Sequence, residues 1–474
     1  MSTPRFTVDA SSRLKVWLKR AEVDRAVIYA LSARSWQLLA GPVTLVLIAR
    51  NFSAELQGYY YTFASLLALQ TLVELAFYIV VINVASHQWA HLALDRNGRI
   101  VGDGDSLSRL VSLGRLIFKW YAVVSLIFIV GVGAGGYFFF SRGPLITLHW
   151  QAPWFALVVL TGFVLWALPF NSLLEGCNQV ATIQRFRLNQ VILETTVLWI
   201  VIAMGGGLWA LVASAAVKLM RDLYLLLVQY RRFFEPFFNR PTGARVIWKT
   251  DLWPMQWRLA LSGFVAYFVS SFFNPIMFRY HGPVVAGQMG MTLILIYAIQ
   301  TIPLAWIQTK VPRFGVMIAH KDYGALDRFW LRASSVSLVV ASLAAAGLWS
   351  GVYVMNALKF HLASRLLPPL PTGVLLVAMV LMQIGQCQTA YLRAHRQEPI
   401  MVLSVTLGVA SGLVIWLCGR RYGPTGAALG YLIVVAGSLV WETIVWFRCR
   451  AKWHAPQPES ETLGRWDSLI ESVP

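Results

Sequence analysis

Eight ionisable side chains lie well inside stretches that are otherwise apolar. Six are the main candidates, namely Arg34, Glu74, Glu194, Lys218, Arg258 and Glu442, and Arg221 and Asp222 sit slightly shallower than Lys218 in the same stretch. A charge at the centre of a membrane helix costs about 2.5–3.5 kcal/mol, so it normally faces other protein groups or a water-filled cavity. At about 1.5 Å per residue, the first four fall about 12–16 Å from the inner ends of their stretches, near the middle of a bilayer. The chemistry that they suit is anion binding by the cations and ion coupling by the carboxylates.

Two hypotheses about the roles of these charged residues remain open. In the first, Arg34, Lys218 and Arg258 line a hydrated cavity and bind an anionic group, for which the guanidinium fork of arginine suits phosphate well. Glu74 or Glu194 then couples an ion to transport. In the second, Arg34–Glu74, Lys218–Glu194 and Arg258–Glu442 are ion pairs that hold a helix bundle together. Lys218 also has Asp222 one turn along its own helix as a candidate partner.

A duplicated stretch carries two further polar candidates. Residues 49–71 and 278–301 each contain the end of one apolar stretch, a short connection with an arginine, and a second apolar stretch with a Gln-Thr pair inside it. The pairs begin at Gln70 and Gln300, which are 230 positions apart (300 − 70). Both glutamines are candidates for binding sugar hydroxyls, with hydrogen bonding between helices as the alternative. Internal duplication in an apolar chain is typical of transporters built from two halves.

The elements that position these residues are membrane helices. Hydrophobic residues make up 57% of the 474 residues and charged residues 13%, about half the charged share of a soluble domain. We therefore predict an all-α polytopic membrane protein with about twelve transmembrane helices in two six-helix lobes around a central cleft. The predicted spans are 26–48, 60–84, 117–140, 153–174, 186–204, 207–229, 253–277, 284–306, 331–355, 371–392, 399–418 and 424–447.

The basic residues predict the orientation. With both termini inside, seven Lys and Arg fall in the outer connections and four well within spans, which leaves 29 (40 − 7 − 4) at the cytoplasmic side. The predicted parts are a basic N-terminal segment (1–25), a first lobe (26–229), a cytoplasmic loop (230–252), a second lobe (253–447) and a cytoplasmic tail (448–474). Residues 1–25 show no cleavable signal peptide. The net charge of +19 is attributed to anionic membrane lipids, not to nucleic acid.

Motifs for other chemistries are weak or missing in the sequence. It contains no GxxxxGK[ST], HExxH or GxSxG pattern, and its four cysteines are widely separated. His87, His91 and Asp95 would share a face if their stretch were helical, but a polar face at headgroup level is the favoured reading. Asp103-Gly104-Asp105 matches a short metal-binding pattern of sugar-nucleotide enzymes, and a solvated turn is favoured there. We expect no enzymatic activity, no metal site and no cofactor.

The connection from Arg50 to Tyr61, the Glu74 span, residues 253–258 (WPMQWR) and residues 286–290 (AGQMG) resemble bacterial polysaccharide-biosynthesis flippases. These belong to the multidrug/oligosaccharidyl-lipid/polysaccharide exporter superfamily. The resemblance implies two lobes that open alternately to either side of the cytoplasmic membrane. It also implies a cationic cleft for the pyrophosphate of a polyprenyl-linked oligosaccharide, an ion gradient as the driving force, and a glycan polymerase and glycosyltransferases as partners. The alternatives are a drug/cation antiporter of the same superfamily and a membrane enzyme of glycan assembly.

Overall fold

The structure, a computed structural model, describes residues 25–74, 77–142, 148–241, 243–253, 256–257, 261, 267–395 and 401–454. Helices make up almost all of this part of the chain. Eight of these helices are long and apolar enough to cross a membrane alone, and one bent pair forms a ninth. One of the eight folds back on itself and supplies two spans. The described helices therefore account for the predicted polytopic fold.

The first lobe contains the helices of the first six predicted spans. Their bounds are α2 (Arg25–Asn51), α3 (Ala54–Leu67), α4 (Gln70–Glu74), α5 (Phe77–Trp89), α6 (Gly104–Ser141), α7 (Gln151–Gly176), α8 (Val180–Ala203) and α9 (Trp209–Tyr224), which continues as the π-helix η1 (Leu225–Gln229). Within its described residues, the second span is interrupted at Ala68 and Leu69, between α3 and α4. After η1 come α10 (Arg231–Phe234), η2 (Glu235–Phe238) and η3 (Trp248–Leu252).

The second lobe contains the remaining helices. They are α12 (Phe273–His281), α13 (Pro283–Gln308), α14 (Val311–Ala319), α15 (Tyr323–Ala357), η4 (His361–Arg365), α16 (Pro369–Ala394) and α17 (Met401–His454). Helix α17 holds the last two predicted spans, because the chain turns at Gly423, whose φ of 66° favours glycine and precedes Pro424. Much of the seventh predicted span lies outside the described residues.

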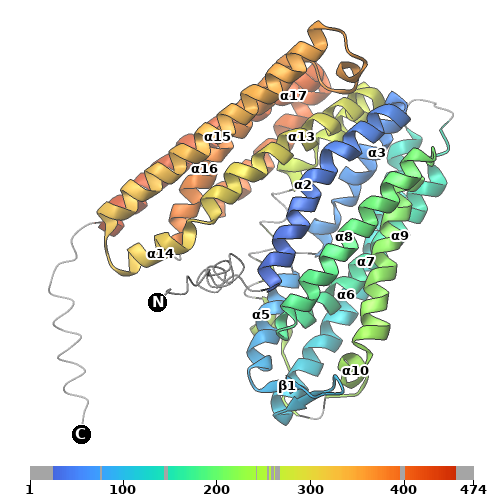
Figure 1. Cartoon of the computed structure of the whole chain (residues 1–474), viewed down its shortest axis with the longest axis vertical. Coiled ribbons are helices and arrows are strands. Elements are labelled where there is room, and N and C mark those ends of the chain that lie inside the picture. Colours follow the sequence, from blue (N-terminus) through green and yellow to red (C-terminus); the bar gives the residue numbers. More distant parts are fainter. Residues whose placement is uncertain are drawn as a thin grey trace, which may run out of the picture.

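The two lobes meet at one end of the molecule and diverge toward the other (Figure 1). We call the meeting end the closed face. It contains the end of α2, the start of α3, the turn between α12 and α13, and η4. The opposite end carries α14 in the second lobe and the β-hairpin in the first. By the orientation predicted above, the closed face is the outer one.

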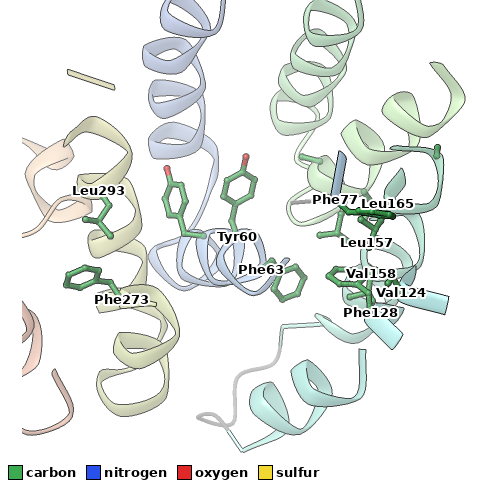
Figure 2. Packing of buried hydrophobic residues seen from close by; sticks show 14 of the residues in the cluster. Tyr60, Phe63, Phe77, Val124, Phe128, Leu157, Val158, Leu165, Phe273 and Leu293 are labelled. Atoms are coloured by element: carbon green, nitrogen blue, oxygen red, sulfur yellow. The ribbon is translucent and has the colours of Figure 1, made fainter. Parts of the chain in front are cut away.

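Helix α3 lies between the two lobes. Figure 2 shows its Phe63 on the side of Phe128 and Val158 of the first lobe. Tyr61 of α3 packs against α13, because a Cβ on Gly290 would lie 2.5 Å from it. Tyr59, also on α3, packs edge-on against Phe278 of α12 with ring centroids 4.9 Å apart. Aromatic rings in such contacts pack tightly and prefer a limited set of geometries. The lobe contact is therefore centred on α3, which belongs to the first copy of the duplicated stretch.

The connection after α5 is a β-hairpin and not a continued helix. Helix α5 ends at Trp89, and β1 (Leu92–Leu94) pairs antiparallel with β2 (Ile100–Gly102). The Oδ1 atom of Asp95 closes the turn by accepting from the backbone N–H groups of Asn97 and Arg99, at 2.8 and 2.7 Å. His87, His91 and Asp95 therefore do not share a helix face, and the described residues hold no metal-ligand cluster.

The Asp103-Gly104-Asp105 turn begins a helix. Asp103 is the N-cap of α6, and its Oδ2 atom accepts from the backbone N–H of Ser106 at 2.8 Å. This hydrogen bond stabilises the charged carboxylate and lowers the pKa of Asp103. A helix cap accounts for this acidic triplet without a bound metal or nucleotide.

Candidate functional site

A cluster of charged and polar side chains lies inside the first lobe, where α4, α6, α7, α8 and α9 contribute to it. Glu74 is the last residue of α4, and its side chain is buried with 9% exposed. Its Oε1 atom accepts a hydrogen bond from the Tyr121 hydroxyl of α6 at 3.4 Å. The chain reaches this position through a break after α3, where the Thr71 hydroxyl donates to the Ala68 carbonyl at 2.8 Å. The break divides the second span just before Glu74.

Asp222 on α9 has the most complete set of hydrogen bonds in this cluster. It is 6% exposed, and its Oδ1 atom accepts from Asn171 Nδ2 on α7 at 3.2 Å and from Gln190 Nε2 on α8 at 3.3 Å. The Gln190 amide also donates to the backbone carbonyl of Lys218 at 3.1 Å. Three helices are therefore held together around one carboxylate. A buried carboxylate normally requires such partners.

Lys218 provides the positive charge of the cluster. Its side chain is exposed on α9, and its ammonium interacts favourably with the carboxylates of Glu74, Glu194 and Asp222. Glu194 lies half-buried on α8. Arg187 is a second cation near Asp222, but it is ion-paired with Glu175 at 2.6 Å. Lys218 is therefore the cation left for three carboxylates, which gives the cluster an excess of negative charge when all are ionised. Such a cluster attracts protons or metal cations and repels phosphate.

Arg34 is placed differently from Lys218. It is exposed on α2 and makes no hydrogen bond or ion pair with the described residues. The helix that carries it is fixed to α8 by Trp199, whose Nε1 donates to the Thr44 hydroxyl at 2.8 Å and whose ring lies 6.0 Å from that of Trp36. The Arg34–Glu74 ion pair is not formed, since Glu74 is bonded to Tyr121 instead. Arg34 is thus a positioned cation that no described carboxylate neutralises.

The two glutamines of the duplicated stretch lie in different lobes, Gln70 at the start of α4 and Gln300 inside α13. Gln70 and Gln300 are both half-buried, and neither hydrogen-bonds to another described residue. The threonine after each one makes the same local bond, since the Thr301 hydroxyl donates to the Ala298 carbonyl at 2.7 Å, as Thr71 does to Ala68.

Arg258 lies outside the described residues, so its placement and its pairing with Glu442 stay predictions. Glu442 itself lines a cavity of about 90 Å³ between α16 and the two halves of α17, and its Oε1 atom accepts from the Thr389 hydroxyl at 2.6 Å. Glu442 also has a nearby cation, Arg393 at the end of α16. Three buried or half-buried carboxylates of the described spans, Glu74, Glu194 and Asp222, nevertheless lie together in the first lobe.

The polar shell of Asp222 and the burial of Arg365, the last residue of η4, were not predicted from the sequence. Asn171 and Gln190 are neutral amides on different helices, and nothing in their spacing links them to Asp222. Arg365 lies in a connection, where a basic residue is ordinarily a solvated one. One feature of the sequence could have indicated the Asp222 contacts. Asn171 and Gln190 are polar residues within apolar spans, and such residues tend to hydrogen-bond to polar residues of neighbouring helices.

The comparison with solved structures identifies the fold. A multidrug resistance MATE family transporter of the MOP superfamily, in an inward-facing conformation, matches with a TM-score of 0.67 over 91% of this chain and 99% of its own, at 11% identity. The lipid II flippase MurJ, in an inward closed conformation, matches with a TM-score of 0.65 over 90% of each chain, at 10% identity. This is the fold of the MOP-superfamily transporters. It comprises twelve membrane helices in two lobes around a central cleft.

The MOP fold includes transporters whose names describe different cargoes. The MATE multidrug transporter DinF-BH, solved in complex with a ligand, matches with a TM-score of 0.52 over 96% of this chain and 100% of its own, at 11% identity. No protein-family model matches the chain, and no curated protein sequence matches it. At these identities the likeness establishes the fold. The cargo has to be argued from the chain's own residues.

Proposed function

We propose that this protein is a flippase that moves a lipid-linked oligosaccharide, carried on a polyprenyl pyrophosphate, across the bacterial cytoplasmic membrane by alternating access. The observation that carries the proposal is Arg34. It is an exposed guanidinium in the first span that no described carboxylate neutralises. An intramembrane cation of this kind needs an anion from elsewhere, and a pyrophosphate group entering from the membrane supplies one.

The arrangement of the lobes supports the direction of this transport. The lobes meet at the face predicted to be outer, as expected for a transporter that awaits cargo from the cytoplasmic side (Figure 1). In this proposal the termini are cytoplasmic, and glycosyltransferases of the pathway supply the cargo. A polymerase on the other side of the membrane uses it. Gln70 and Gln300, which have no described hydrogen-bond partner, are available for sugar hydroxyls.

The carboxylate cluster supplies the coupling site in this proposal. Glu74, Glu194 and Asp222 concentrate negative charge around Lys218, because the neighbouring Arg187 is ion-paired with Glu175. Such a site takes up protons or cations and not phosphate, so Lys218 belongs with the carboxylates. Binding of the coupling ion changes the charge of a cluster that α7, α8 and α9 share. It therefore biases the packing of these helices.

A drug/cation antiporter is the second candidate, and the same cluster favours it. If the carboxylates bind the cargo directly, the cargo is cationic. The experiment that separates the two uses the purified protein in liposomes. One sample receives a fluorescent polyprenyl-pyrophosphate oligosaccharide, and the other receives a cationic dye with an imposed proton or sodium gradient. The flippase proposal predicts translocation of the lipid-linked oligosaccharide and none of the dye. Dye transport without oligosaccharide translocation would establish the antiporter.

A further inference from the structure

Arg365 connects the two lobes at the closed face. It is the last residue of η4, and its side chain is 9% exposed. The guanidinium Nη2 donates to the backbone carbonyl of Phe52 in the first lobe at 2.6 Å. The backbone carbonyl of Arg365 accepts from Gln57 Nε2, also in the first lobe, at 3.1 Å. One residue of the second lobe is thus bonded to the first lobe through both its side chain and its backbone.

The charge of Arg365 is not neutralised in this contact. No carboxylate among the described residues lies within ion-pair distance of it, and its Nη1 atom is buried without a hydrogen-bond partner. Four more polar atoms on α3 and α12 are also buried without a partner, namely Gln57 Oε1, Tyr61 Oη, Thr62 Oγ1 and Asn274 Oδ1. Burying a charge or a polar group in this way is unfavourable. Separation of the lobes would expose these groups to water or to a ligand.

The closed face as a whole carries an excess of positive charge. Six other basic residues lie in the connections of the closed face, Arg50, Arg142, Arg279, Lys359, Arg420 and Arg421, whereas Glu55 is the acidic residue of the connections described there. Arg279 even donates through Nη1 to the backbone carbonyl of Arg142 at 2.6 Å. A face with this balance attracts anions and holds them close to its cations.

We propose that Arg365 is an exit site for the phosphate-bearing end of the cargo, in addition to joining the lobes. This inference rests on the function proposed above. When the lobes part at the closed face, the guanidinium leaves the Phe52 carbonyl, and its N–H groups become available to a phosphate group. An anion that binds Arg365 only after this separation stabilises the open state by its difference in affinity for the two states. Cargo arrival at the exit thereby favours opening.

The test measures opening of the closed face directly. Spin labels are attached at Asn51→Cys and Leu358→Cys, two exposed positions in different lobes, in full-length protein that lacks the four native cysteines. The distance between the labels is measured by electron–electron double resonance in nanodiscs of uncharged lipid, with increasing inorganic pyrophosphate. Chloride at equal ionic strength is the control. Arg365→Gln, Arg365→Lys and Arg50→Gln are compared with the parent protein. Arg50 is an exposed cation of the same face.

We expect pyrophosphate to increase the open fraction in the parent protein, in Arg365→Lys and in Arg50→Gln. In Arg365→Gln the half-maximal concentration rises about tenfold or more, as expected when a charge-assisted hydrogen bond to an anion is lost. An unchanged response in Arg365→Gln, or no response in the parent protein, overturns the exit site. Opening by phosphatidylglycerol nanodiscs without pyrophosphate would assign the site to membrane lipid instead and also overturn it. The liposome assay judges the flippase proposal separately, because it measures cargo translocation and not opening.

Discussion

The side-chain amide of Gln57 donates to the backbone carbonyl of Gly287 at 2.9 Å, and the two residues are 230 positions apart in the chain. This is also the spacing of the Gln-Thr pairs in the duplicated stretch. The first copy of that stretch is therefore packed directly against the second. Both copies carry glycine where they meet, since a Cβ on Gly58 would lie 1.9 Å from the Pro283 carbonyl oxygen and one on Gly287 would lie 2.9 Å from the Gly58 nitrogen.

Gly58→Val is predicted to disfavour the closed face. Its side chain overlaps the backbone of α13, and overpacking of this kind typically costs about 1–3 kcal/mol. The equilibrium between the two states should therefore shift about 5- to 150-fold toward opening at this face. The rate at which a thiol reagent modifies Ser65→Cys in a cysteine-free background measures the shift, because Ser65 is buried in the contact. Gly41→Val is the control, since nothing lies within 4 Å of a Cβ there. Equal rates for the two variants would contradict this account.

Arg34→Ala is predicted to stop export of the surface glycan while the protein remains in the membrane. The substitution removes the intramembrane guanidinium that no described carboxylate pairs with, and a charge-assisted hydrogen bond is worth about 1.5–3 kcal/mol, or about tenfold or more in affinity. Surface glycan is measured with membrane protein level in the same cells. Arg50→Ala, an exposed arginine at the other end of α2, should export normally. Normal export by Arg34→Ala would remove the main reason for an anionic cargo.

Glu74→Gln is predicted to separate cargo movement from the ion gradient. The amide keeps the size of the side chain and its hydrogen bond with the Tyr121 hydroxyl, but it removes a charge that takes part in the cluster around Lys218. Exchange of cargo across liposomes should persist, whereas gradient-driven accumulation should fall about tenfold or more, the size of a typical coupling free energy. Glu55→Gln at the closed face is the control. Full accumulation by Glu74→Gln would show that the coupling ion binds elsewhere.

The pH dependence of stability should report on His395 at the end of α16. Its Nδ1 bonds to the Tyr391 carbonyl at 3.1 Å, its ring stacks on Trp453, and His454, Asp327 and Arg450 are the ionisable groups nearby. Burial lowers the pKa of His395, and with the charge of His454 it outweighs the opposite effects of the Tyr391 hydrogen bond and of Asp327. The folded protein therefore binds protons less readily than the unfolded chain does. The contribution of neutral His395 to the free energy of unfolding is therefore present above about pH 6.5, the ordinary histidine pKa, and is lost as the pH falls below this value.

The measurement is the thermal unfolding temperature of the detergent-solubilised protein between about pH 7.5 and 5, a range that brackets the ordinary histidine pKa. We predict that it falls less steeply in His395→Gln than in the parent protein. The control is His361→Gln, an exposed histidine of η4, which should keep the parent slope. If His395→Gln also keeps that slope, protonation of His395 does not contribute to the loss of stability.

Much of the helical arrangement could be predicted from the sequence, because long apolar stretches have few alternatives to a membrane helix. The duplicated stretch was visible in the Gln-Thr pairs, and Gly423-Pro424 separates the last two spans. The division of the second span was not predicted. A break between Leu67 and Gln70 changes few residues in an apolar window, so hydropathy does not reveal it.

The sequence predicted which charged residues belong to the candidate site, but not how their side chains are arranged. Depth along each span placed Glu74, Glu194 and Lys218 in one layer, and the structure brings their charges together. Depth along a helix does not show in which direction around the helix a side chain points. By depth alone, Arg34 and Lys218 were therefore equally suitable ion-pair partners for Glu74. Arg365 was missed because its burial depends on Phe52 and the neighbouring α3, which lie more than 300 residues earlier in the chain.

Transport by this mechanism requires the lobes to part at the closed face and release a phosphate-bearing cargo. A disulfide across that face tests this requirement most directly. The side chains of Ser65 and Asn274 face each other across the lobe contact, with 2.8 Å between Oγ and Nδ2. In a cysteine-free background, Ser65→Cys with Asn274→Cys is oxidised and then reduced in liposomes that contain a fluorescent polyprenyl-pyrophosphate oligosaccharide. We predict that the cross-linked protein does not translocate the oligosaccharide and that reduction restores translocation. Translocation at the full rate by fully cross-linked protein would contradict the proposed mechanism.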